Sequence, residues 1–219
     1  LELSLLAMVA GMRFEAPLST PAITLLPSWQ EEVAIVEPVG GLPVAIGEQL
    51  GAGRNIMRYL RTQRRGEEAR LVDLTRLEDA AAVAEAGKAG VELEIRRDKK
   101  GAIASWSVRC GGLAVAVVGE RPRVLGQWDR IAPALVVAKG RAGREDSAES
   151  WNARWLFLTG ENAAVDSAGT YRRSSCGAIR VAETGAGGPR LRAYDGRAWV
   201  EIADSSAATV RPASPARLP

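Results

Sequence analysis

The segment VELEIRRDKKGAIASWSVRC, residues 91–110, indicates the main secondary structure of this protein more clearly than any other segment. Residues 91–96 alternate apolar with charged side chains, and the second half places Trp106, Val108 and Cys110 on one face. Alternation with a period of two predicts strands that have one buried face. The sequence RDKKG between the two halves predicts a turn. The segment therefore predicts two strands that are joined by that turn.

Short apolar runs on both sides of this segment extend the β pattern. The strands predicted from them lie at residues 33–36, 42–46, 111–119, 132–140, 151–160 and 176–183. Near the end of the chain, Asp195-Gly196 stands between two alternating runs. An Asp-Gly pair in this position predicts a tight hairpin over residues 191–203.

Two helices are predicted before the main run of strands. Residues 54–65 and 74–87 suit helices, and Gly87 is placed to end the second one. Helices gathered on one side of a run of strands disfavour regular alternation of the two and suit a fold of packed sheets. The predicted fold class is mainly β, sandwich-like or jelly-roll-like, with two or three short helices inserted before the main strands.

The predicted organisation is one domain between two proline-bearing ends. Residues 1–30 are expected to form an extended N-terminal arm, because three prolines fall within residues 13–30. Residues 31–205 are expected to form a single β-rich domain with a helical insertion near residues 54–87. Residues 206–219 are predicted to be a flexible, proline-rich tail. No internal repeat of fixed period is visible in the sequence.

The composition argues against several kinds of chemistry. The 219 residues include no histidine, which removes the commonest general base near neutral pH and the commonest metal ligand. Cys110 and Cys176 lie far apart and form no CxxC pair, which argues against a structural zinc site. They are expected to be free buried thiols, with a single disulfide as the alternative. Neither a cofactor nor a bound metal ion is predicted.

One segment resembles a nucleotide-binding loop in its composition. Gly47, Gly51 and Gly53 follow an apolar run and precede the first predicted helix, whose free N–H groups are suited to hold phosphate. Their spacing matches neither GxxxxGK[ST] nor GxGxxG, so the preferred interpretation is a turn into the helix. Adjacent acids such as Glu78-Asp79 point in different directions and predict a solvated face.

The first predicted helix carries an unbalanced positive charge. Residues 54–65 contain five arginines and no acid, whereas the whole chain has a formal net charge of only +3. Four of the five would fall within about 60° of one another on a helix, and the fifth lies beside them. These residues, called the arginine ridge below, are Arg54, Arg58, Arg61, Arg64 and Arg65.

The arginine ridge has three interpretations at this stage. It is a solvated face, or it contacts the phosphates of RNA or DNA, or it contacts an acidic patch of another protein. Contact with phosphates would be directed at the nucleic-acid backbone, because Tyr59 is the only aromatic side chain available for stacking on bases.

These features predict a structural protein that assembles with itself. The proline-bearing ends, the β-rich domain and the basic ridge suit a coat, capsid or tail protein of a virus or phage, as a homo-oligomer. A monomeric nucleic-acid-binding module is the alternative, and an enzyme that uses carboxylates or a nucleotide is the second alternative.

The apolar run at residues 1–12 is too short for a membrane helix and lacks the basic start of a signal peptide. The protein is therefore expected in a virion or the cytoplasm, neither secreted nor in contact with a membrane.

Overall fold

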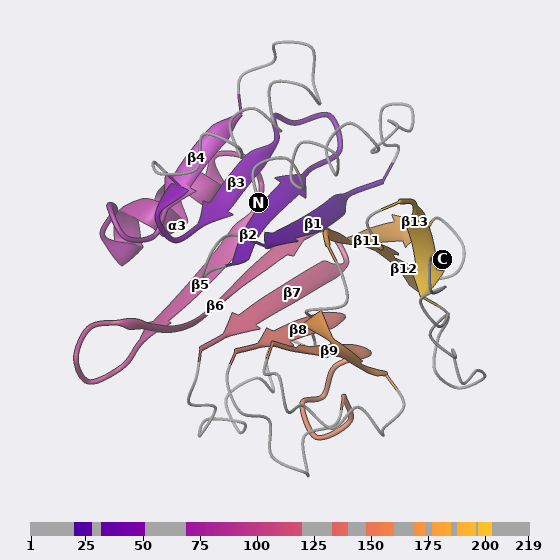
Figure 1. Cartoon of the computed structure of the whole chain (residues 1–219). Coiled ribbons are helices and arrows are strands. Elements are labelled where there is room, and N and C mark those ends of the chain that lie inside the picture. Colours follow the sequence, from indigo (N-terminus) through magenta and orange to yellow (C-terminus); the bar gives the residue numbers. More distant parts are fainter. Residues whose placement is uncertain are drawn as a thin grey trace, which may run out of the picture.

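A computed structural model describes nine segments of the chain. They are residues 20–27, 32–50, 69–119, 133–139, 148–159, 169–173, 177–184, 188–195 and 197–202. Most of these residues lie in strands, which are arranged in two sheets (Figure 1). The prediction of a mainly β fold is therefore confirmed.

The seven-stranded sheet joins the first and the last strands of the described chain. Its order is β13-β12-β11-β1-β2-β3-β4, and all its neighbours are antiparallel except β3 and β4, which are parallel. The strands are β1 (Ala22–Pro27), β2 (Glu32–Glu37), β3 (Val44–Gly47), β4 (Arg70–Asp73), β11 (Ile179–Thr184), β12 (Gly188–Tyr194) and β13 (Trp199–Ile202).

The six-stranded sheet is formed by the middle of the chain. Its order is β10-β9-β8-β7-β6-β5, with antiparallel pairs from β5 to β7 and parallel pairs from β7 to β10. The strands are β5 (Glu92–Arg97), β6 (Ile103–Cys110), β7 (Leu113–Val118), β8 (Leu135–Ala138), β9 (Trp155–Leu158) and β10 (Thr170–Arg172). The parallel pairs distinguish this sheet from the antiparallel pairing of a jelly roll.

The three consecutive strands β7, β8 and β9 have a constant register. Val115, Leu135 and Trp155 are successive Cα partners, so each strand lies 20 residues after the previous one. Figure 1 shows these strands side by side. The sequence shows no such repeat because only the strands correspond, as VAVV, LVVA and WLFL, whereas the segments between them differ.

One hydrophobic core lies between the two sheets and receives side chains from both. Alternate residues of each strand point into it, as the period of two requires. Its members include Ile23, Val36, Ile46, Val108, Val115, Phe157 and Val181. The helix α3 (Asp79–Gly87), which lies beside β4 and β5, adds Ala82 and Ala86 to the same core (Figure 1).

The strands that the sequence did not predict are β1, β4 and β10. The largest difference is β1, because its residues 22–27 belong to the segment expected to be an arm. Instead β1 lies in the middle of the seven-stranded sheet, paired with β2 and β11, and five of its six residues are buried. The apolar run of β1 ends at Pro27, the last residue of the strand, and the pairing of β1 with β11 ends earlier, at Leu25. Residues 1–19 and 28–30 of the expected arm lie outside the described residues.

The second predicted helix is confirmed in type but begins later than expected. Residues 74–78, which the sequence assigned to the helix, form a turn, and α3 begins at Asp79. The helix ends at Gly87 as predicted, although the residue with a positive φ is Gly90, at 72°. The other predicted helix, at residues 54–65, lies outside the described residues. Among the described residues, no helix has the length and apolar character needed to span a membrane.

The predicted hairpin at residues 191–203 is present as β12 and β13. Leu191 pairs with Ile202 and Tyr194 pairs with Trp199, so residues 195–198 connect the strands. The Asp195 carboxylate accepts hydrogen bonds from the N–H groups of Arg197 and Ala198, at 2.8 and 2.9 Å. The predicted turn type depends on Gly196, which lies outside the described residues.

Candidate functional site

The sites predicted from the sequence fall mostly outside the described residues. All five arginines of the ridge lie within residues 51–68, and so do Gly51 and Gly53. The ridge therefore stays a prediction.

Of the two cysteines, Cys110 is a buried free thiol, as expected, and Cys176 lies outside the described residues. Burial raises the pKa of the Cys110 thiol, and the nearby charge of Glu183 adds to that effect.

Gly47 is described and does not serve as a turn residue. It is the last residue of β3 and pairs with Asp73 of β4. A Cβ atom at this position would lie 3.0 Å from the backbone oxygen of Glu32 and 3.1 Å from Cγ2 of Val33. The absence of a side chain therefore permits close approach of β2, which is a packing role and not phosphate binding.

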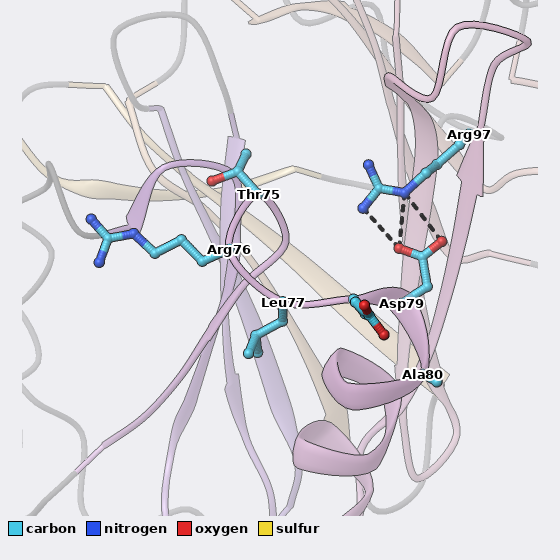
Figure 2. A pocket seen from close by; sticks show the side chains of 7 residues that line it. Thr75, Arg76, Leu77, Asp79, Ala80 and Arg97 are labelled. Atoms are coloured by element: carbon cyan, nitrogen blue, oxygen red, sulfur yellow. Dashed lines mark hydrogen bonds and ion pairs between the residues drawn. The ribbon is translucent and has the colours of Figure 1, made fainter.

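An open depression of about 470 Å³ lies where β4 leads into α3. Such a position, beyond the carboxyl ends of the parallel strands β3 and β4, is a common place for ligand sites in sheets with parallel strands. The lining residues come from the turn after β4, from the start of α3 and from the end of β5 (Figure 2). They are Thr75, Arg76, Leu77, Glu78, Asp79, Ala80 and Arg97.

Arg97 joins the three elements around this depression. Its Nε and Nη2 donate to the carboxylate of Asp79 at 2.8–3.2 Å, as Figure 2 shows. Nη2 also donates to the carbonyl of Leu74, and Nη1 donates to the carbonyl of Gly101 at 2.9 Å. The hydrogen bonds with Asp79 raise the pKa of the Arg97 guanidinium, and the charge of Glu48 contributes to the same shift. Every nitrogen of this side chain therefore has a protein acceptor.

Asp73 organises the turn that forms the opposite wall. Its Oδ1 accepts hydrogen bonds from the N–H group of Thr75 at 3.0 Å and from the Thr75 hydroxyl at 2.6 Å. The second carboxylate oxygen lies 3.5 Å from Nε of Arg76. Figure 2 shows the Arg76 side chain extending away from the pair of Arg97 and Asp79. These bonds compete with helix formation and explain why α3 begins only after this turn.

The charges that line the depression are balanced and mostly paired. Two arginines and two acids line it, and each nitrogen of the Arg97 guanidinium already has a protein acceptor. Within the described residues, no group of three or more Cys, Asp or Glu side chains is placed to hold a metal ion. Arg97 positions β5 against α3 through Asp79, and the carboxylate of Glu78 lines the same depression.

A second charged pair, Glu32 with Arg173, is buried between the two sheets. Arg173 follows β10 and donates from Nε and Nη2 to the two carboxylate oxygens of Glu32 on β2, at 2.8 and 2.9 Å. Its Nη1 donates to the carbonyl of Gly177. The side chains are only 4% and 5% exposed, so this bidentate pair is a structural connection between the sheets.

The edge of the seven-stranded sheet at β13 exposes an apolar side chain in the described part of the chain. β13 has one neighbouring strand, β12, and Val200 in its centre is 47% exposed. A strand at a sheet edge presents unpaired N–H and C=O groups that can pair with another chain. The sequence predicted β13 only as half of a hairpin and did not indicate that this strand lies at a sheet edge.

Comparison of the chain with protein-family models, with curated proteins and with solved structures gives no significant match.

Proposed function

We propose that the protein is a self-associating structural subunit whose two sheets form a sandwich. The observation that carries this proposal is the open edge at β13, where an exposed valine lies in the middle of a strand that has one neighbour. Monomeric β proteins usually protect such edges with charge, proline or a covering element, because an open edge associates.

The narrower form of the proposal is a coat, capsid or tail protein of a virus or phage. It rests on sequence features: the proline-bearing ends and the arginine ridge, which would contact packaged nucleic acid or a neighbouring subunit. The finding that β1 is a central strand shortens the N-terminal segment that is available for exchange between subunits.

The two alternatives have less support from the described residues. An enzyme would need a group that transfers protons or binds an anion, and both arginines of the depression beside α3 already lie beside a carboxylate. A monomeric nucleic-acid-binding module would use an uncompensated basic surface. On β11, Arg180 instead pairs with Glu37, at 3.0 Å, and both side chains are mostly buried.

The molar mass in solution tests the proposal. Size-exclusion chromatography with light scattering, over a wide range of concentration, should give a mass at least twice that of the chain, and negative-stain microscopy should show particles of uniform size. A mass equal to that of one chain at the highest concentration would refute the proposal.

A further inference from the structure

The backbone of β13 exposes its hydrogen-bonding groups at alternate residues. The N–H group of Asp195 donates to the carbonyl of Ala198 at 3.2 Å, which makes these two residues a hydrogen-bonded pair. Hydrogen-bonded pairs alternate with non-bonded pairs along an antiparallel ladder. Val200 and Ile202 therefore direct their backbone groups toward β12, whereas Trp199 and Glu201 direct theirs away from it.

The neighbouring strand supports this phase. The N–H group of Tyr194 donates to Ala178, and its carbonyl accepts from the N–H group of Gly177. The N–H and C=O groups of Tyr194 therefore point toward β11, so Tyr194 and Trp199 form a non-hydrogen-bonded pair. Among the described residues, β12 is the one strand that pairs with β13, so the outward N–H groups of Trp199 and Glu201 face no other strand there.

We infer that β13 pairs antiparallel with β13 of a second copy, about a two-fold axis that passes through Val200. This inference rests on the proposed function and specifies the interface. The axis is perpendicular to the sheet, so the two seven-stranded sheets become one continuous sheet. Trp199 of each copy then exchanges backbone hydrogen bonds with Glu201 of the other, and the two Val200 side chains face each other.

The positions of charges and hydrogen bonds select this register over its neighbours. Residues opposite each other in an antiparallel pair point to the same face, whereas successive residues of one strand point to opposite faces. The axis must therefore pass through a residue and not between two residues. An axis through Glu201 would place two carboxylates directly opposite each other, which is destabilising. An axis through Trp199 would need the N–H group of Arg197, which is already bonded to the Asp195 carboxylate. Of these three axes, only the one through Val200 uses N–H groups that face away from β12 and opposes no like charges.

The side chains at this edge are arranged to fill such an interface. Val200 would bury the apolar surface that is now 47% exposed. The ring of Trp199 is held edge-on against Tyr194, with the ring centroids 5.7 Å apart, and so presents a fixed surface opposite Glu201 of the second copy. Fixed aromatic side chains lose little entropy on association.

Proline at position 201 tests the hydrogen bonds of the interface. Glu201→Pro removes an N–H group that faces away from β12, so the hairpin keeps its ladder, and proline is tolerated at such edge positions. We expect the dimer dissociation constant to rise by at least about tenfold, a loss of about 1.4 kcal/mol. Glu201→Ala is the matched control, because it removes the exposed contact with Arg190 but keeps the N–H group; its dimer should persist.

A cysteine at position 200 tests the register directly. Opposed residues of a non-bonded antiparallel pair have Cα atoms about 4.5 Å apart, within the range of a disulfide. Under mild oxidation, Val200→Cys should give a covalent dimer in high yield. Leu71→Cys, at a similarly exposed position on β4 at the opposite edge, should stay monomeric on a non-reducing gel.

The outcomes separate this inference from the proposed function. If the parent protein is monomeric at every concentration, both fail. If the parent associates, but Val200→Cys gives no more covalent dimer than Leu71→Cys, the interface lies elsewhere and only the inference is overturned. Circular dichroism of Glu201→Pro checks that it is folded, and the cysteine variants decide the question if it is not.

Discussion

At the scale of single residues, the buried pair of Glu32 and Arg173 is the interaction whose loss should cost most. Arg173→Met keeps an unbranched apolar stem but removes the guanidinium, so it leaves the Glu32 carboxylate buried without a cation. Breaking a buried pair in this way typically costs about 3–5 kcal/mol. Urea denaturation should show a loss of that size.

The matched control is Arg190→Met. Arg190 lies 3.8 Å from Glu201, and both side chains are more than half exposed. Removing a surface pair of this kind should change the free energy of unfolding by no more than about 0.5–1 kcal/mol. An equal effect of the two substitutions would mean that Glu32 and Arg173 do not form the buried contact.

Asp195 provides a prediction on pH. The N–H groups of Ala198 and Arg197 that bond to its carboxylate lower its pKa in the folded protein. A lowered pKa stabilises the fold at pH values above the ordinary pKa of aspartate, about 3.9, and this contribution is lost as the pH falls through the folded value. Asp195→Asn, which can still accept those bonds, should therefore lose less stability than the parent between pH 5 and pH 2. Thermal melting of both proteins across this range measures the difference, and parallel curves would refute the assignment.

At the scale of elements, Gly47 and Gly87 differ in the space that is available for a side chain. A Cβ at Gly47 would meet the backbone of β2, whereas a Cβ at Gly87 would meet nothing within 4 Å. Gly47→Ala should destabilise the protein by about 1–3 kcal/mol, as overpacking does. Gly87→Ala at the end of α3 should be neutral or slightly stabilising, because alanine favours a helix. Melting temperatures that fall equally would show that β2 and β3 are not as close as described.

The strands predicted correctly are those whose pattern is local. Residues 92–97 alternate in polarity, and the Asp195 turn separates two runs that pair with each other, so the sequence alone shows both. β4 (RLVD) holds only two apolar residues between charged ones, and β10 (TYR) has three residues in all, so neither shows the apolar run that indicated the other short strands. β1 has a clear apolar run, but the prolines around it suggested an irregular segment. Its central position depends on pairing with β11, which no local pattern reveals.

The depression beside α3 was not predictable either, because the residues that form it are distant in the sequence. Asp79 was assigned to a solvated face because the adjacent acids Glu78 and Asp79 point in different directions. Its partner Arg97 is 18 residues away and comes close only when β5 lies against α3. The one available signal was Asp73 with Thr75, two turn-forming residues at the start of the predicted helix.

At the scale of the whole molecule, the arginine ridge predicts how the protein responds to nucleic acid and salt. If Arg54, Arg58, Arg61 and Arg65 contact phosphates, binding should weaken steeply as the salt concentration rises. Replacing all four with Gln should lower the affinity and make the dependence on salt shallower by several contacts. The fold should be almost unaffected, since Gln and Arg have similar helix propensity.

Fluorescence anisotropy with a labelled RNA and a labelled DNA, at several salt concentrations, measures this effect. Binding by the quadruple variant equal to that of the parent would exclude the ridge as the site. A loss of self-association without nucleic acid would identify an acidic protein surface as the partner of the ridge instead.

The division of the seven-stranded sheet between the two ends of the chain has a consequence for protein synthesis. Ala22 of β1 pairs with Ala182 of β11, 160 residues later, and the whole six-stranded sheet is encoded between them. At about 5–20 residues per second, β1 waits on the order of 10 s for its second neighbour to leave the ribosome. During that interval one edge of an apolar strand is open to the strands of neighbouring nascent chains. The β11–β12–β13 unit closes this edge at the end, so the yield of native protein should depend on the speed of translation and on chaperones that cover β1 until then.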